Sequence, residues 1–232
     1  MKFSLIVPVS ADSPEYKSAM PYVFNLNKEG IMLCVKSITG LNLQIFDNIY
    51  FTILSSHDER YYIKSMLEFQ FKRLGMEKAK VVVLEKPTKS QAETIFKTIE
   101  KEGIEGSIFI KDADGYFESD IVRQNSVAIF PIESMQVINP QNKSYVAVDD
   151  MFYITNIIEK KVISHEFNAG GYCFENVDDF VEYYKKVNSM GSKIYLSHII
   201  YSMLLDRYIF RPQQVENFKD WGNNNLYKYF NS

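Results

Sequence analysis

Short apolar runs alternate with helix-like segments along the first half of the chain. The runs are rich in β-branched and aromatic residues and predict strands over residues 3–9, 49–54, 81–84 and 107–111. Apolar positions recur at helical spacing over residues 32–40, 57–74 and 88–101. Gly75 and Gly103 stand where helices commonly end. This alternation predicts a mostly parallel sheet, because parallel strands need a crossover segment between them.

After residue 114 the pattern changes to shorter strands separated by turn residues. Strands are expected over residues 126–132, 144–148, 153–158, 162–164 and 171–174, with Asp149 and Asp150 in a hairpin turn. Helices are expected over 177–187, 194–205 and 223–230, and extended chain over 209–217. No repeat or linker interrupts the chain, so we expect one α/β domain over residues 1–232 with a mixed, Rossmann-like central sheet.

Composition narrows the classes of function. The net charge is −3, from 26 basic and 29 acidic side chains that are mixed along the chain, so nothing predicts a nucleic-acid partner or an anionic membrane. No apolar stretch reaches the length of a membrane span, and the N-terminal run is too short for a signal peptide. Cys34 and Cys173 lie far apart in apolar segments, which indicates buried thiols and a cytoplasmic location.

The most informative motif is a pair of carboxylates at the end of an apolar strand. Asp112 and Asp114 follow the run over residues 107–111, and Gly115 comes next. Open α/β sheets bind ligands at the carboxyl ends of their strands. Hard oxygen ligands at this spacing suit Mg²⁺ or Mn²⁺ shared with substrate phosphates. A solvated Asp-Gly turn is the simpler alternative.

Five segments appear in a fixed order along the chain. They are residues 90–94 (SQAET), 111–117 (KDADGYF), 158–160 (IEK), 168–172 (NAGGY) and 219–222 (KDWG). In this order and spacing they resemble motifs of the sugar-phosphate nucleotidyltransferases, which join an NTP to a sugar 1-phosphate. The resemblance implies the glycosyltransferase-A-like (GT-A-like) form of the α/β fold expected above.

The resemblance also implies roles for particular side chains. Asp112, Asp114 and Asp220 would hold Mg²⁺ or Mn²⁺. Gln91 would lie near the nucleobase, and Lys160 would meet the sugar phosphate. The residues implied to line the sugar are Glu159, Asn168 and Gly170.

Gln91 also has a purely structural explanation. Thr88 and Gln91 are spaced as a capping box, and Ser90 and Glu93 form a second such pattern at the start of the same helix. Helix capping and base recognition therefore both remain open for Gln91.

Three other assignments have structural alternatives. Asp220 before Trp-Gly fits a helix cap or a turn. Lys160 is followed by Lys161, so the two fit a surface charge pair. Asn168 and Gly170 fit a turn between two strands that requires a positive φ.

The loop after the first strand departs from the family. The family carries a glycine-rich loop with an Arg and then a Pro-Lys pair, whereas residues 8–15 here contain neither Gly nor Arg and Pro21 is followed by Tyr22. Lys17 is the remaining cation of the loop, and we expect it, with the backbone at Ser10 and Ser13, to contact the triphosphate.

These observations favour a metal-dependent nucleotidyltransferase that joins an NTP to a sugar 1-phosphate or similar phosphorylated acceptor and expels pyrophosphate. The resemblance implies that its product is an activated sugar for surface polysaccharide synthesis. The altered loop favours an alternative, a GT-A-type glycosyltransferase that uses a nucleotide sugar. A nucleotide-sugar-binding protein without activity is a third hypothesis, and a homo-oligomer is compatible with each.

Overall fold

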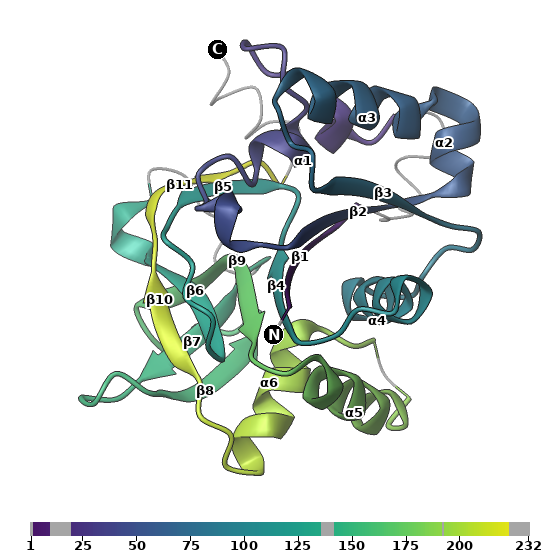
Figure 1. Cartoon of the computed structure of the whole chain (residues 1–232). Helices are drawn as coiled ribbons and strands as arrows, with labels where there is room; N and C mark the ends of the chain where they lie inside the picture. Colours follow the sequence, from purple (N-terminus) through teal and green to yellow (C-terminus); the bar gives the residue numbers. More distant parts are fainter. Residues whose placement is uncertain (1, 10–19, 136–141, 192, 223–232) are drawn as a thin grey trace.

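The computed structural model of the chain describes residues 2–9, 20–135, 142–191 and 193–222. Its centre is a mixed sheet that is drawn in Figure 1. Four parallel neighbours form one half of the sheet, in the order β3 (Ala79–Leu84), β2 (Asn48–Leu54), β1 (Phe3–Pro8) and β4 (Ser107–Lys111). This confirms the parallel half that the strand–helix alternation predicts.

The other half of the sheet begins at β9 (Glu166–Phe174), which is antiparallel to β4. The sheet continues through β6 (Ser126–Pro131) to β10 (Arg211–Gln214). A hairpin of β7 (Ser144–Val148) and β8 (Ile154–Glu159) joins the sheet through the pairing of β7 with β9. The mixed α/β fold predicted from the sequence is therefore confirmed.

Alternating side chains of each central strand pack on opposite faces of the sheet. In β1, Leu5 and Val7 are buried in one apolar cluster and Ile6 in the other, as the two-residue period of a strand requires. In Figure 1, α1 (Leu33–Lys36), α2 (Ser55–Tyr61) and α3 (Ile63–Arg73) lie on one side of the sheet. On the other side lie α4 (Gln91–Glu102), α5 (Val177–Asn188) and α6 (Leu196–Leu205). Short 3₁₀ helices span Tyr22–Phe24, Leu43–Ile45 and Ile132–Ser134.

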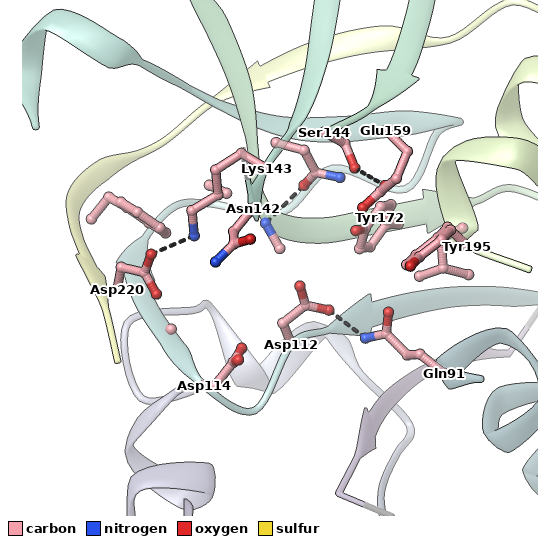
Figure 2. Close-up of a pocket in the computed structure, with 16 residues that line it drawn as sticks. Gln91, Asp112, Asp114, Asn142, Lys143, Ser144, Glu159, Tyr172, Tyr195 and Asp220 are labelled. Atoms are coloured by element: carbon pink, nitrogen blue, oxygen red, sulfur yellow. Dashed lines mark hydrogen bonds and ion pairs between the residues drawn. The ribbon is translucent and has the colours of Figure 1, made fainter. Parts of the chain in front are cut away.

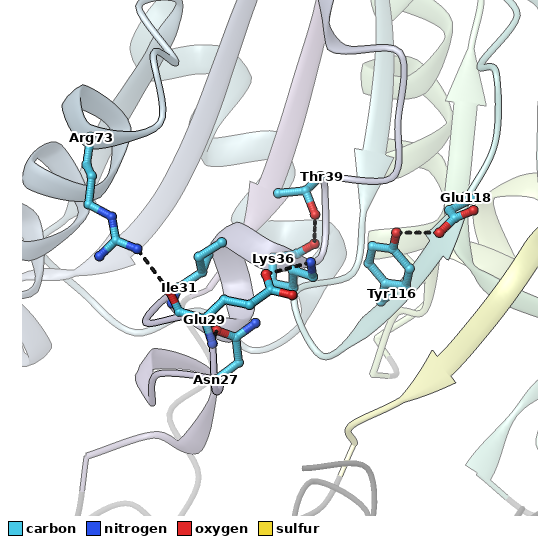
Figure 3. A network of polar contacts seen from close by, with 8 residues as sticks. All are labelled: Asn27, Glu29, Ile31, Lys36, Thr39, Arg73, Tyr116 and Glu118. Carbon is cyan, nitrogen blue, oxygen red and sulfur yellow. Dashed lines mark hydrogen bonds and ion pairs between the residues drawn. The ribbon is translucent and has the colours of Figure 1, made fainter.

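A separate two-stranded ribbon stands beside the sheet, formed by β5 (Gly115–Glu118) and β11 (Glu216–Asp220). Figure 3 shows the polar network that holds it. The Lys36 ammonium lies 5.6 Å from the centre of the Tyr116 ring and 2.9 Å from a carboxylate oxygen of Glu29, and the Tyr116 hydroxyl donates to Glu118. Asn27 and Arg73 brace the Glu29 backbone, so the ribbon rests on an ordered segment.

The helix expected over residues 57–74 is wrong as a single helix. Tyr62 takes a left-handed backbone (φ 56°) between α2 and α3. Asp58 fixes this break, because its carbonyl accepts the Tyr62 N–H and its carboxylate accepts the Lys64 N–H. The helix expected over 32–40 is likewise short and ends at Lys36.

Two expectations for the second half are also wrong. Residues 162–164 form no strand, and the Ser164 hydroxyl instead lies within hydrogen-bond distance of the carbonyl oxygens of Val146 and Glu166, at 2.7 and 2.9 Å. Asn168 and Gly170 lie inside the nine-residue strand β9 rather than in a turn, because β4 and β6 pair with both edges of that strand. The helix expected over 223–230 lies outside the described residues.

In the described part of the chain, no helix combines the length and apolarity needed to cross a bilayer.

Candidate functional site

A pocket of about 170 Å³ lies at the carboxyl end of β4, as Figure 2 shows. Residues of the loop after β4, of the β7–β8 hairpin and of the end of β11 form its walls. The middle of β9, Gln91 at the start of α4, and Tyr195 just before α6 complete them. The sequence pattern places a ligand site at this edge, since parallel strands deliver their following loops there.

Asp114 and Asp220 approach each other at this pocket. The ribbon register sets Asp220 opposite Gly115, and the Trp221 N–H donates to the Asp114 carbonyl at 2.8 Å. A Cβ atom on Gly222 would lie 2.9 Å from Asp220 Oδ1 and 3.6 Å from Asp114 Oδ2, so both oxygens adjoin one point. Asp220 also closes a turn by accepting the Gly222 N–H at 2.8 Å.

Asp112 turns toward α4 and the sheet rather than toward Asp220. Its Oδ1 accepts a hydrogen bond from Gln91 Nε2 at 2.5 Å, and its N–H donates to the Gly170 carbonyl at 2.8 Å. Burial, followed by repulsion from Asp114, raises the pKa of Asp112 to about 6. Gly170 is required beside it, because a Cβ there would lie 2.6 Å from Asp112 Oδ2 and φ is +83°.

Lys111 is a member of the site that the sequence analysis missed. Its side chain is fully buried, and its ammonium donates to the carbonyls of Asp112 and Gly115 at 2.9 and 2.8 Å. The Phe117 ring lies 4.6 Å from the ammonium. Burial lowers the pKa of Lys111 to about 8, against the attraction of the nearby carboxylates. The one sequence signal is a lysine that ends an otherwise apolar strand, and we infer that it braces the loop that carries both aspartates.

The β7–β8 hairpin brings Glu159 to the pocket and leaves Lys160 outside its lining. Glu159 is held by the hydroxyls of Ser144 and Ser197. Lys160 follows the last residue of β8, and its left-handed backbone (φ 57°) ends the regular alternation of side chains. Its exposed ammonium lies 3.3 Å from the Tyr195 hydroxyl.

Lys143, the cross-strand neighbour of Lys160, lines the pocket instead. The Lys160 N–H donates to the Lys143 carbonyl at 2.9 Å, and the Lys143 ammonium lies 2.5 Å from Asp220 Oδ2. The sequence analysis missed Lys143 also. In the structure residue 143 lies opposite residue 160, but the register shifts between Ala147 and Val148, so counting back from the turn at Asp149 and Asp150 does not find this pairing.

In the structure Gln91 does not cap α4. Ser90 is the helix cap, with its hydroxyl accepting the Glu93 N–H at 3.2 Å. The Thr88 hydroxyl contacts that of Thr94 at 2.6 Å, so the capping box expected for Thr88 and Gln91 is absent. The Gln91 side chain is thereby left to line the pocket beside Asp112.

Asn168 and Gly170 both line the pocket from β9. The Asn168 side-chain oxygen accepts the Gly170 N–H at 2.7 Å. This bond stabilises the strand irregularity that lets Gly170 pass close to Asp112.

No protein-family model and no curated protein sequence matches the chain. Among solved structures, it is similar to the nucleoside-diphosphate-sugar pyrophosphorylase of Vibrio cholerae RC9, with a TM-score of 0.80 and 16% identity over 97% of this chain and 98% of that chain. The inositol-1-phosphate CTP transferase of T. maritima gives a TM-score of 0.71 at 17% identity over 97% and 93%. A UDP-glucose pyrophosphorylase solved with UDP-glucose gives 0.72 at 13% identity over 99% of both chains.

The chain has the fold of the nucleotide-sugar pyrophosphorylases. At these identities the similarity is one of fold, and it confirms the GT-A-like fold that the five motifs imply. Across the described ranges, no three His, Cys, Asp or Glu side chains cluster as metal ligands, so the site offers the pair Asp114 and Asp220.

Three predicted triphosphate contacts, Ser10, Ser13 and Lys17, lie outside the described residues and stay predictions. Cys34 and Cys173 are buried, and burial raises the pKa of each thiol to about 12. Both cysteines are therefore neutral thiols within the apolar core at physiological pH.

Proposed function

We propose that this protein is a nucleotidyltransferase that joins an NTP to a sugar 1-phosphate or a similar phosphorylated small molecule and releases pyrophosphate. The observation that carries the proposal is the meeting of Asp114 and Asp220 beside Lys143 in one pocket at the end of β4. The fold shared with nucleotide-sugar pyrophosphorylases supports it.

The reaction asks for alignment and charge neutralisation rather than covalent participation by the protein. An oxygen of the acceptor phosphate attacks the α-phosphorus of the NTP. The bond to the bridging oxygen breaks, and pyrophosphate departs with that electron pair. The attacking oxygen is already anionic, so no general base is needed. The described residues contribute by fixing the acceptor and the carboxylates.

The residues present fit a divalent cation. Mg²⁺ is commonly bound by one or two carboxylates together with substrate phosphates, and its remaining ligands are waters. Asp114 and Asp220 would hold Mg²⁺ or Mn²⁺ with the oxygens that adjoin one point. When bound, the cation supplies charge neutralisation at the phosphates. Asp112, whose Oδ1 accepts a hydrogen bond from Gln91, would contribute its negative charge to the same site.

The other predicted contacts divide between the two substrates. On the acceptor side, the proposal uses Glu159 and Asn168, which line the pocket, and the close-packed Gly170. On the nucleotide side it uses Gln91 near the base, with Ser10, Ser13 and Lys17 toward the triphosphate. The resemblance implies that Lys160 meets the sugar phosphate, but its ammonium lies beside Tyr195 and outside the pocket lining. The activated sugar would serve surface polysaccharide synthesis.

One observation favours a second candidate function. Residues 8–15 lack the glycine that lets backbone N–H groups approach a triphosphate closely and the arginine that neutralises departing pyrophosphate. A GT-A-type glycosyltransferase, which holds the diphosphate of a nucleotide sugar, does not require that loop to release pyrophosphate.

The test measures pyrophosphate release from ATP, CTP, GTP, UTP and dTTP with a panel of sugar and polyol phosphates, with Mg²⁺ or Mn²⁺. The reverse reaction is followed with nucleotide sugars and pyrophosphate. Asp114→Asn should lower kcat/KM at least a hundredfold, or about 2.7 kcal/mol, since one carboxylate of the pair loses its charge. Asp150→Asn removes a charge from the exposed hairpin turn and serves as the matched control.

Absence of pyrophosphate release with every pair, combined with sugar transfer from a nucleotide sugar, would favour the glycosyltransferase instead. Nucleotide-sugar binding without either reaction would leave the third hypothesis, a binding protein.

A further inference from the structure

Within the described part of the chain, the one Lys or Arg side chain that lines the pocket is Lys143. Lys111 is close by but lies buried beneath the loop, where two backbone carbonyls take its hydrogen bonds. Lys160 extends along Tyr195 at the exposed end of the hairpin. Lys143 is therefore the described cation best placed to meet an anionic ligand in the pocket.

The position of the Lys143 ammonium is tightly defined. Its side chain is only 17% exposed, and the rings of Phe218 and Phe167 lie 5.4 and 5.8 Å from the ammonium. One side of the ammonium meets Asp220 Oδ2 at 2.5 Å. An ammonium carries three N–H donors. Because Asp220 takes one of them, and the described residues provide no second ion-pair partner, two donors remain for a ligand.

The charges around the pocket also favour this role. Asp112, Asp114 and Asp220 bring three negative charges, and Lys111 and Lys143 bring two positive charges. A phosphate dianion that enters such a site needs a cation with unused donors close to it. Lys143 meets that condition in the described pocket, whereas Lys111 does not.

We propose that Lys143 binds the phosphate group of the phosphorylated acceptor, with Asp220 holding its ammonium in place. The inference rests on the nucleotidyl transfer proposed above and names the acceptor-side residue of that site. Lys143 would bind the acceptor phosphate oxygens that do not attack, so that the third oxygen faces the α-phosphorus of the NTP. Lys143 directly precedes β7, whose first residue, Ser144, pairs with Glu159, and this position beside the proposed acceptor-side Glu159 assigns it to the acceptor.

The experiment compares Lys143→Gln with Lys161→Gln, a control that removes the same charge from an exposed position two residues beyond β8. Isothermal titration of each purified protein uses inorganic phosphate, α-D-glucose 1-phosphate, pyrophosphate, UTP and Mn²⁺ as probes. Lys143→Gln should raise the Kd of glucose 1-phosphate and of inorganic phosphate at least tenfold, and it should change the Kd of UTP less than threefold. Mn²⁺ should bind equally well or more tightly, because Asp220 loses a competing cation. Lys161→Gln should match the wild-type protein.

Other outcomes overturn the proposal. Equal losses of affinity for UTP and glucose 1-phosphate would show that Lys143 contacts both substrates. A loss of affinity for UTP or pyrophosphate alone would assign Lys143 to the nucleotide. Weaker Mn²⁺ with unchanged phosphate binding would show that Lys143 only orders Asp220. A loss confined to Lys160→Gln, or a wild-type protein that binds neither phosphate probe, also refutes it.

Two checks keep this test separate from that of the proposed function. Far-ultraviolet circular dichroism identifies a variant that fails to fold, and Lys143→Arg, which keeps the charge, should recover part of the phosphate binding. If the wild-type protein binds glucose 1-phosphate and UTP but releases no pyrophosphate, the proposed function fails. The comparison of the two variants still decides the role of Lys143.

Discussion

Replacing Asp112 by Asn should make the ligand-free protein more stable at neutral pH. Asn keeps the Oδ1 atom that accepts the Gln91 N–H, and it nearly preserves the shape of the side chain beside Gly170. It removes the negative charge that burial and Asp114 disfavour. The gain in the free energy of unfolding therefore reports the cost of ionising this carboxyl group in the folded protein.

The pKa of Asp112 determines the size of this stability difference and the direction in which it changes with pH. It is about 6 in the folded protein against an ordinary 3.8, so the folded state holds the proton more tightly. Stability of the wild-type protein should fall as the pH rises from about 4 to 6, because in that window the folded state binds more protons than the unfolded state. A shift of about two units corresponds to at most about 3 kcal/mol at pH 7, and water in the pocket reduces it.

Urea unfolding at pH 4, 5, 6 and 7 in metal-free buffer with a chelator measures this difference. Trp221 is the single tryptophan and is only 4% exposed, so its fluorescence reports unfolding next to the site. The free energy of unfolding of Asp112→Asn should exceed that of the wild-type protein by about 1–3 kcal/mol at pH 7 and equal it near pH 4. A difference that is independent of pH, or a less stable variant at pH 7, would refute the reasoning. Asp150→Asn, at an exposed position, should show no such trend.

Two further substitutions test the packing around the carboxylates. Gly170→Ala should destabilise the protein by about 1–3 kcal/mol more than Gly191→Ala, as measured by urea unfolding, because both glycines have positive φ but only a Cβ at Gly170 meets Asp112. Comparable losses in the two variants would contradict the close approach. Lys111→Met should lower the free energy of unfolding by about 3 kcal/mol, since two carbonyls lose their donor and the carboxylates lose a buried counter-charge. A loss below about 1 kcal/mol would show that the ammonium does not brace the loop.

Much of the parallel half was predictable, because its signals are local. An apolar run such as β4 buries both faces in a covered sheet, and Asp112 and Asp114 follow it directly in the chain. The Tyr62 break was not predictable from periodicity. Apolar spacing continues through it, and the break depends on two hydrogen bonds accepted by Asp58.

The candidate site likewise contains residues that the sequence reveals and residues whose position depends on strand pairing. Its aspartates are visible as motifs, whereas the place of Lys143 depends on hairpin register and on the later pairing of β11 with β5. Asn168 and Gly170 look like turn residues in isolation. They lie in a strand because pairing along both edges of β9 outweighs the local preference of these residues.

The β5–β11 ribbon has a consequence for the order of events during synthesis. Asp114 and its supporting Lys111 leave the ribosome early, but Asp220 follows more than a hundred residues later. The strands β1 to β4 can pair before that, so a half-made chain can present a formed sheet edge with one carboxylate of the pair absent. The pocket therefore acquires Asp220, and with it the carboxylate pair, only after all the strands of the central sheet have been translated.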